Sequence, residues 1–178
     1  QHSEKSEMSS ETFSHRGSIF NYMAEQILAR QEPAVQNFLL HISVLPEVEV
    51  GAARHVTEHA DAERLLHAVL KLSPIVTMTG EMPLSLRLRP LFRDFLSQEL
   101  ALRAPLLPNR LHSRAAEYYA AVGELHKAVH HASLSGDNEL TARILENAGG
   151  ALLVISEGIA GAGALLAALP PSFVNSRP

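Results

Sequence analysis

The amino-acid sequence predicts a mainly α-helical protein that contains one small β-hairpin. Leucine and alanine, which both favour helices, account for 27 and 24 of the 178 residues. Apolar residues recur at helical spacing in most segments, and one segment alone shows the alternation that is typical of strands. Aromatic residues make up 5% of the chain and cysteine is absent, so a disulfide scaffold is excluded.

The first part of the chain contains a succession of helical patterns. Residues 1–17 are polar and show no period, so we expect a disordered lead-in. Order is expected to begin near Ser18, an acceptable N-cap, and Pro33 suits the first turn of the second helix. The predicted helices cover residues 19–31, 33–43, 48–57 and 61–72.

The helical pattern is interrupted once. Two short β-like runs, residues 75–77 and 84–88, lie on either side of Gly80. Pro90 then begins a strongly periodic helix that closes this unit. Helices followed by one hairpin and a closing helix indicate a winged-helix domain, which we assign to residues 18–104.

The rest of the chain is predicted to be helical. Gly123 and Gly136 lie where a helix C-terminus needs a chain-reversing residue, and Asp137 can cap the next helix. Glu124 and Glu157 lie 33 residues apart at corresponding turns, which fits two α-helical hairpins of the tetratricopeptide type. The predicted helices cover residues 110–123, 124–136, 137–156 and 157–170, within a tetratricopeptide-like segment at 105–170 that is followed by a tail at 171–178.

Composition and motifs exclude several classes of function. The chain has no phosphate-binding Gly-x-x-x-x-Gly-Lys-Ser/Thr loop, no Gly-x-Gly-x-x-Gly turn and no Gly-x-Ser-x-Gly motif. We therefore expect no enzymatic activity and no cofactor in this chain. The formal net charge of −4 gives no general attraction to nucleic acid or anionic membranes, and no apolar run is long enough to cross a bilayer. A soluble, cytoplasmic protein is expected.

The ten histidines raise the question of a metal site. His126 and His130 lie four residues apart in one predicted helix, as do His55 and His59, and this spacing can place two imidazoles on one metal ion. A third ligand at a recognisable spacing is missing. We therefore predict that these are exposed helical histidines and that the chain has no metal site. The pair His130-His131 is expected to be half buried and half solvated.

Basic residues concentrate in one stretch, which contains Arg87, Arg89, Arg93, Arg103, Arg110 and Arg114. On a winged helix, Arg87, Arg89 and Arg93 could reach DNA phosphates. The alternative is that they form a solvated rim or a surface that meets another domain. The helix expected to enter a DNA groove carries the acidic residues Asp61 and Glu63, which is unfavourable for base recognition.

Three segments in order carry a family resemblance. They are IFNYMAEQILARQEPAVQNFLLHISVL with Tyr22, Glu25, Leu28, Phe38, Leu39, Ser43 and Leu45; LRLRPLFRDFLSQEL; and LHSRAAEYYAAVGELHKAVHHASLSGD with Leu111, His112, Ala115, Ala116, Tyr118, Tyr119, Ala128, Val129, His131, Ala132, Gly136 and Asp137. Over residues 18–170 the chain resembles the central region of the large ATP-dependent LuxR-type transcriptional regulators. These are the MalT-like members of the STAND class of signal-transduction ATPases.

The resemblance implies a position within a larger protein. Such regulators carry an N-terminal nucleotide-binding domain, a winged helix, a helical superhelix that senses an inducer or partner protein, and a C-terminal helix-turn-helix that binds DNA. This chain would hold the winged helix and the first superhelix units, and ATP or ADP would bind elsewhere in the parent protein. Its partners would be the other domains of the parent chain and an inducer or partner protein on the repeats, with DNA bound only through the C-terminal domain and no membrane contact.

The wing departs from the family signature, which reads aromatic-Arg-aromatic-His-x-Leu-Phe. In relatives, the histidine can contact the phosphates of bound ADP. This chain has Leu86, Arg87, Leu88 and Arg89 at the first four positions. By resemblance, Arg89 together with Arg87 would face the nucleotide-binding domain, where arginine can pair with phosphate bidentately. The alternative is that the contact is lost and the arginine is simply exposed.

We therefore predict a non-catalytic signal relay in a transcriptional regulator, which couples a nucleotide-binding domain to a helical sensor domain. Two alternatives from other functional classes stay open. One is a winged-helix DNA-binding module whose arginines contact phosphates. The other is a protein-docking scaffold made by the helical repeats.

Overall fold

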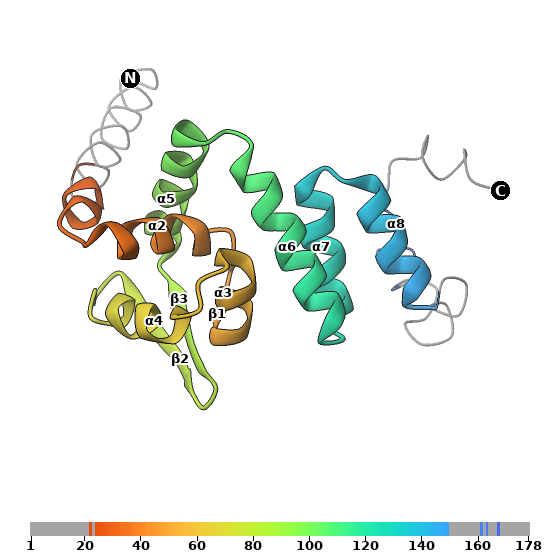
Figure 1. Cartoon of the computed structure of the whole chain (residues 1–178), viewed down its shortest axis with the longest axis horizontal. Coiled ribbons are helices and arrows are strands. Elements are labelled where there is room, and N and C mark those ends of the chain that lie inside the picture. Colours follow the sequence, from red (N-terminus) through yellow and green to blue (C-terminus); the bar gives the residue numbers. More distant parts are fainter. Residues whose placement is uncertain (1–21, 23, 150–160, 162, 164–166, 168–178) are drawn as a thin grey trace, which may run out of the picture.

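The computed structural model describes residues 22, 24–149, 161, 163 and 167 (Figure 1). Residues 24–29 are helical and precede α2 (Pro33–Ile42), β1 (Val48–Glu49), α3 (Val50–Thr57), α4 (Ala62–Leu70), β2 (Val76–Glu81), β3 (Leu84–Leu88) and α5 (Pro90–Arg103). The order of α2 to β3 is the one expected of a winged helix. The predicted mainly α-helical class with one hairpin is confirmed.

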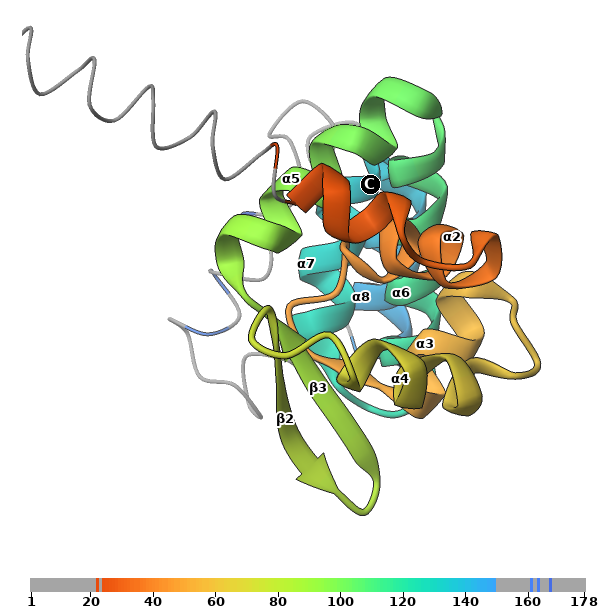
Figure 2. The same cartoon turned by 90° about the vertical axis from the view of Figure 1, so that its left-hand side faces the viewer.

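The three strands form one antiparallel sheet in the order β1-β3-β2. Leu86 on the central strand pairs with Val48 on one side and with Met78 on the other. Figure 2 shows that β2 and β3 project beyond the helices as a hairpin. We call this hairpin, residues 76–88, the wing.

Two local predictions were wrong. Residues 48–57 were expected to form one helix, but Val48 and Glu49 are extended because they pair with β3. Gly80 was expected between the two strands, yet it lies within β2, which continues to Glu81. The strand extends because its backbone pairs with β3, and a Cβ at position 80 would lie 2.7 Å from the Ser85 hydroxyl oxygen. Glycine therefore permits the close approach of the two strands.

Beyond α5 the chain forms α6 (Leu107–Ala121), α7 (Leu125–Ser135) and α8 (Asn138–Asn147), which lie side by side (Figure 1). Gly123 and Gly136 adopt φ values of 81° and 74°, as a helix C-terminus requires. Asp137 caps α8, since its carboxylate accepts a hydrogen bond from the Leu140 N–H at 2.9 Å. These three predictions are confirmed. That the helices form tetratricopeptide repeats stays a prediction.

Several predictions fall outside the described residues. They concern the lead-in at residues 1–17, the N-cap at Ser18, most of the helix at 157–170 and the tail at 171–178. The single helix predicted over residues 137–156 is wrong, because α8 ends at Asn147 and Gly149 takes a positive φ of 111°, which is incompatible with a continuing helix. Within the described part of the chain, no helix is both long and apolar enough to cross a membrane.

One hydrophobic core runs through the described structure. Its largest members include Phe38 in α2, Phe92 in α5 and Leu111 in α6, all fully buried. The same cluster continues into α7 and α8. The winged helix and the helical segment are therefore packed against each other directly, with α3 lying against α6.

Candidate functional site: the wing and the junction

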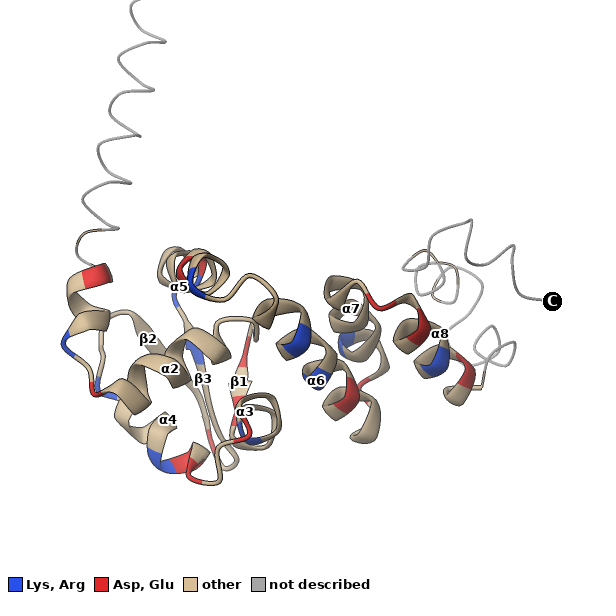
Figure 3. Cartoon of the chain, turned by 45° about the horizontal axis from the view of Figure 1, so that its top comes forward, with Lys and Arg blue, Asp and Glu red and all other residues tan. Residues whose placement is uncertain are grey.

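The arginines predicted to be functional lie on or beside the wing. Figure 3 shows that basic and acidic residues are interspersed over the described helices and strands. Arg87 is exposed on β3, with a guanidinium nitrogen 3.8 Å from a carboxylate oxygen of Glu47. Arg89 directly follows β3, and its Nε donates a hydrogen bond of 2.7 Å to the carbonyl of Pro74. Arg93 is half-buried in the first turn of α5.

Alternation along β3 explains which signature positions face outward. Leu86 and Leu88 are buried in the core, so Arg87 and Arg89 lie on the opposite side of the strand. The two positions at which the family has aromatic residues are thus core positions, and leucine fills them. Leu91, which follows at the start of α5, is 64% exposed. The wing therefore presents two arginines and a nearby exposed leucine.

A second candidate site lies where α3 packs against α6, and we call it the junction. It consists of Gly51, His55, Val56, Glu58, Arg114 and Tyr118. Gly51 contacts the Tyr118 side chain so closely that a Cβ would meet the hydroxyl group and lie 3.1 Å from Cζ. The His55 and Tyr118 rings are 5.8 Å apart. A helix without a side chain at position 51 thus receives the tyrosine ring.

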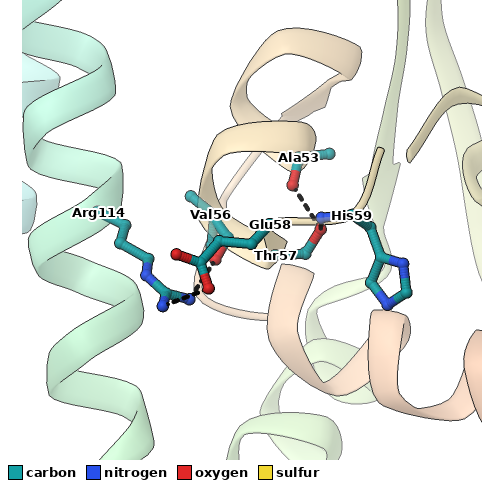
Figure 4. A network of polar contacts seen from close by, with 6 residues as sticks. All are labelled: Ala53, Val56, Thr57, Glu58, His59 and Arg114. Carbon is teal, nitrogen blue, oxygen red and sulfur yellow. Dashed lines mark hydrogen bonds and ion pairs between the residues drawn. The ribbon is translucent and has the colours of Figure 1, made fainter. Parts of the chain in front are cut away.

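The polar part of the junction is centred on Arg114 (Figure 4). Its guanidinium donates to the Val56 carbonyl at 3.2 Å and to the Glu58 carboxylate at 2.6 Å. The Thr57 hydroxyl donates back to the Ala53 carbonyl at 2.8 Å, and it accepts from the His59 N–H at 3.3 Å. Arg114 therefore satisfies a carbonyl at the C-terminus of α3, where a positive charge also interacts favourably with the helix dipole.

His41 of α2 is influenced by the same group of residues. Its Nδ1 is buried and has no hydrogen-bond partner among the described residues. Burial lowers the pKa of His41, and the nearby His59 and Arg114 lower it further. All three effects favour the neutral imidazole.

A histidine pair, His112 and His131, adjoins the junction and joins α6 to α7; His131 is buried and His112 is half-buried. The Nδ1 atoms of His112 and His131 lie 2.9 Å apart, so one ring donates and the other accepts. The His131 ring also stacks on Tyr119 at 5.4 Å. Burial is the main cause that lowers the pKa of His112 to about 4 and that of His131 to about 3, with neighbouring histidines adding to the effect. Burial likewise raises the pKa of Tyr119 to about 12.

The structure tests the predicted histidine geometry. His59 lies beyond the end of α3 at Thr57, so His55 and His59 do not share a helix, contrary to the spacing argument. His130 is exposed and His131 is buried, as predicted. Among the described residues, no group of three or more histidine or acidic side chains could hold a metal ion.

The sequence reasoning did not assign a role to Gly51, Glu58 or Arg114 at a domain junction. The contact at Gly51 could have been predicted from the sequence, because a glycine inside a helix often marks a close approach of another element. The role of Glu58 could not have been predicted from the sequence, because its backbone conformation depends on where the chain turns after α3. Arg114 was grouped with the wing arginines, although the structure places it on α6.

The fold and the exposed wing define a winged-helix domain of the kind found in transcriptional regulators. Residues 24–108 match the family model described as the MalT winged helix domain. Over these residues, slightly less than half of the chain, the protein is similar to the MalT winged helix domain, and the chain is MalT-like.

The relatives are much longer proteins. The chain is 28% identical over 132 residues to the HTH-type transcriptional regulator MalT of Vibrio campbellii, a match that covers 74% of this chain and 14% of that protein. It is 28% identical over 123 residues to the regulator of the same name in Yersinia pestis, covering 67% and 13%. It is 29% identical over 119 residues to the serine/threonine-protein kinase PknK of Mycobacterium tuberculosis, covering 67% and 11%. The chain thus spans less than a sixth of each of these relatives.

Proposed function

We propose that this chain is a non-catalytic signal-relay segment of a LuxR-type transcriptional regulator. The observation that carries the proposal is the packing of α3 against α6. The core is continuous from the winged helix into the helical segment, and Gly51 and Tyr118 interlock across the junction. A displacement of the wing would therefore be transmitted to α6, because close-packed interiors transmit strain.

The two ends of this relay would meet different partners. Arg87, Arg89 and Leu91 would contact a nucleotide-binding domain of the parent protein, which would hold ATP or ADP, and Arg93 would lie at the edge of that interface. The helices α6 to α8 would belong to a tetratricopeptide-like sensor that binds an inducer or a partner protein. DNA would be bound by a separate C-terminal domain, in the cytoplasm. The MalT relatives are HTH-type transcriptional regulators, which supports DNA binding by another part of the parent protein.

The structure gives less support to DNA binding by this winged helix. Arg64, the arginine of the candidate recognition helix α4, lies 3.9 Å from Asp61, and Glu63 is adjacent in sequence. Arg87 on the wing lies beside Glu47. These carboxylates would approach the DNA backbone together with the basic groups, which opposes phosphate contacts.

The relay proposal is tested by the substitution Arg89→Ala in the full-length regulator. Loss of a charge-assisted hydrogen bond costs about 1.5–3 kcal/mol, so ADP affinity should fall by about tenfold or more. Arg103→Ala is the matched control, because Arg103 is an exposed arginine on α5 that pairs with Glu99 within its own helix. Unchanged ADP affinity in Arg89→Ala would refute the role proposed for the wing.

The DNA-binding alternative is tested with the 178-residue chain and a labelled duplex, by fluorescence anisotropy. Binding that weakens with salt and is lost in an Arg87→Ala/Arg89→Ala/Arg93→Ala variant would favour the alternative. Absence of binding at low salt would leave the arginines available for a protein domain.

A further inference from the structure

The residue that ends α3 has an unusual backbone conformation. Glu58 adopts φ 56° and ψ 21° in the left-handed region. Among the described residues it is the one non-glycine residue with positive φ. Helices commonly end with a left-handed residue, but glycine is strongly favoured there because a Cβ is crowded in that conformation. Because glutamate rather than glycine occupies this left-handed position, we infer that the Glu58 side chain has a role.

The side chain of Glu58 makes a contact across the junction. Its carboxylate lies 2.6 Å from a terminal nitrogen of Arg114, and the same guanidinium donates to the Val56 carbonyl. The Arg114 side chain is only 22% exposed, whereas that of Glu58 is 67% exposed. One arginine of α6 thus binds two groups at the C-terminus of α3, which lies more than 50 residues earlier in the sequence.

We propose that Glu58 and Arg114 form a latch that sets the angle between the winged helix and α6. The inference rests on the proposed relay function, because a relay needs a defined angle between its two units. The winged helix and α6 can turn about the contact between Gly51 and Tyr118, because this contact holds α3 close to α6 without a directional hydrogen bond. The latch adds two directional hydrogen bonds at one end of α3. Because Glu58 is largely exposed, the ion pair can open without exposing the core.

The left-handed conformation places the Glu58 carboxylate within reach of Arg114. Glycine would relieve the crowding but would remove the carboxylate. The two effects of Glu58→Gly therefore have opposite signs: the helix end becomes easier to form, and the tie to α6 is lost. If Glu58 had a purely local role, Glu58→Gly would only make the end of α3 easier to form and would leave the position of α6 unchanged.

The test measures the distance between the two units in the 178-residue chain. The sequence contains no cysteine, so cysteines introduced at the exposed positions Glu63 on α4 and Ser133 on α7 can be spin-labelled specifically. Pulsed electron resonance then gives the distribution of distances between the labels. Glu58→Gly and Glu58→Gln are compared with Glu99→Gln, which removes an ion pair contained within α5.

The latch predicts that both Glu58 variants broaden or shift the distance distribution, and that Glu99→Gln leaves it unchanged. It also predicts that raising the salt concentration broadens the distribution of the parent chain more than that of Glu58→Gly. A narrow, unshifted distribution in Glu58→Gly, together with a higher melting temperature, would overturn the latch. Arg114→Lys, which keeps the charge but has a single donor nitrogen, should broaden the distribution less than Glu58→Gly, and it gives a second test. These distances do not depend on ADP affinity. The latch can therefore be refuted while the role proposed for Arg89 stands, and the role of Arg89 can be refuted while the latch stands.

Discussion

The wing and the junction use their arginines in different ways. The Arg87 side chain is 59% exposed, and its nearest carboxylate oxygen lies at 3.8 Å. Arg114 is mostly buried and binds two groups of α3, at 2.6 and 3.2 Å. A guanidinium that is held at short distance on several sides is committed to the fold, whereas an exposed one with a distant partner is available to another molecule. Position in the fold therefore separates arginines that the sequence places in one basic stretch.

The same contrast holds for the other polar side chains of these regions. Next to the junction, His112, His131 and Tyr119 are packed against one another between α6 and α7. On the wing, the β2 residues Thr77, Met78 and Thr79 are exposed. The helical region thus places titratable groups in its interior, and the wing presents its side chains outward. Three predictions test this difference, from the largest expected effect to the smallest.

The largest effect is expected from pH. The folded-state pKa values of His112 and His131, about 4 and about 3, lie below the value of about 6.5 expected in the unfolded chain. The unfolded state therefore binds more protons as the pH falls, and stability that is present above pH 6.5 is lost progressively toward pH 4 and below. Each histidine should contribute a slope of up to about 1.4 kcal/mol per pH unit in this window.

Denaturant unfolding at a series of pH values measures this slope. In His131→Phe, the stack on Tyr119 is retained and one titrating group is removed, so the acid slope should fall by up to about 1.4 kcal/mol per pH unit, while His112 and His41 still contribute. The control is His67→Gln, which alters an exposed histidine on α4 that lies outside the His112–His131 pair. An acid slope that is equal in the parent chain and in His131→Phe would contradict the contribution assigned to the His112–His131 pair.

A smaller effect is expected from a side chain at position 51. Gly51→Val should destabilise the chain by about 1–3 kcal/mol, because the new methyl groups would overlap the Tyr118 ring. Arg54→Val is the control, since it introduces the same residue on the exposed face of the same helix. Tyr118→Ala should reduce the difference between the two valine variants in chemical denaturation. If Gly51→Val and Arg54→Val are equally stable, the two helices are not interlocked at this point.

The smallest effect is expected on the wing. Arg87→Ala should change the free energy of unfolding by no more than about 0.5 kcal/mol, because an exposed ion pair contributes little. The measurement is the denaturation midpoint at low and at moderate salt. A loss above about 1 kcal/mol would mean that Arg87 is structural, and it would remove the contrast with Arg114.

Much of the fold followed from local patterns. Pro33 and Pro90 begin helices as expected, and Gly123, Gly136 and Asp137 end or cap helices as expected. These features depend on the conformation and hydrogen bonding of single residues and their neighbours, so sequence alone is informative. The β1 strand was missed because two residues carry no periodicity, and their extended conformation depends on pairing with β3.

In the candidate sites too, the sequence identified single residues, whereas the structure identified the contacts between them. The family motifs singled out both His112 and His131, but their contact across α6 and α7 became visible only in the structure. The wing arginines were identified from their clustering. The structure shows that Arg87 is the exposed residue of β3 and that Arg89, which directly follows the strand, is exposed as well.

By itself, the sequence determined the helical class, the position of the wing, the helix caps and the resemblance of the winged helix to that of MalT-like regulators. Only the tertiary structure decided that Arg114 contacts Glu58, that Gly51 receives Tyr118 and that two histidines share one hydrogen bond. The physical reason is the separation along the sequence of the residues that interact. Caps, turns and periodicity arise within a few residues, whereas contacts between α3 and α6 join residues more than 50 positions apart and exist only after the core has formed around them.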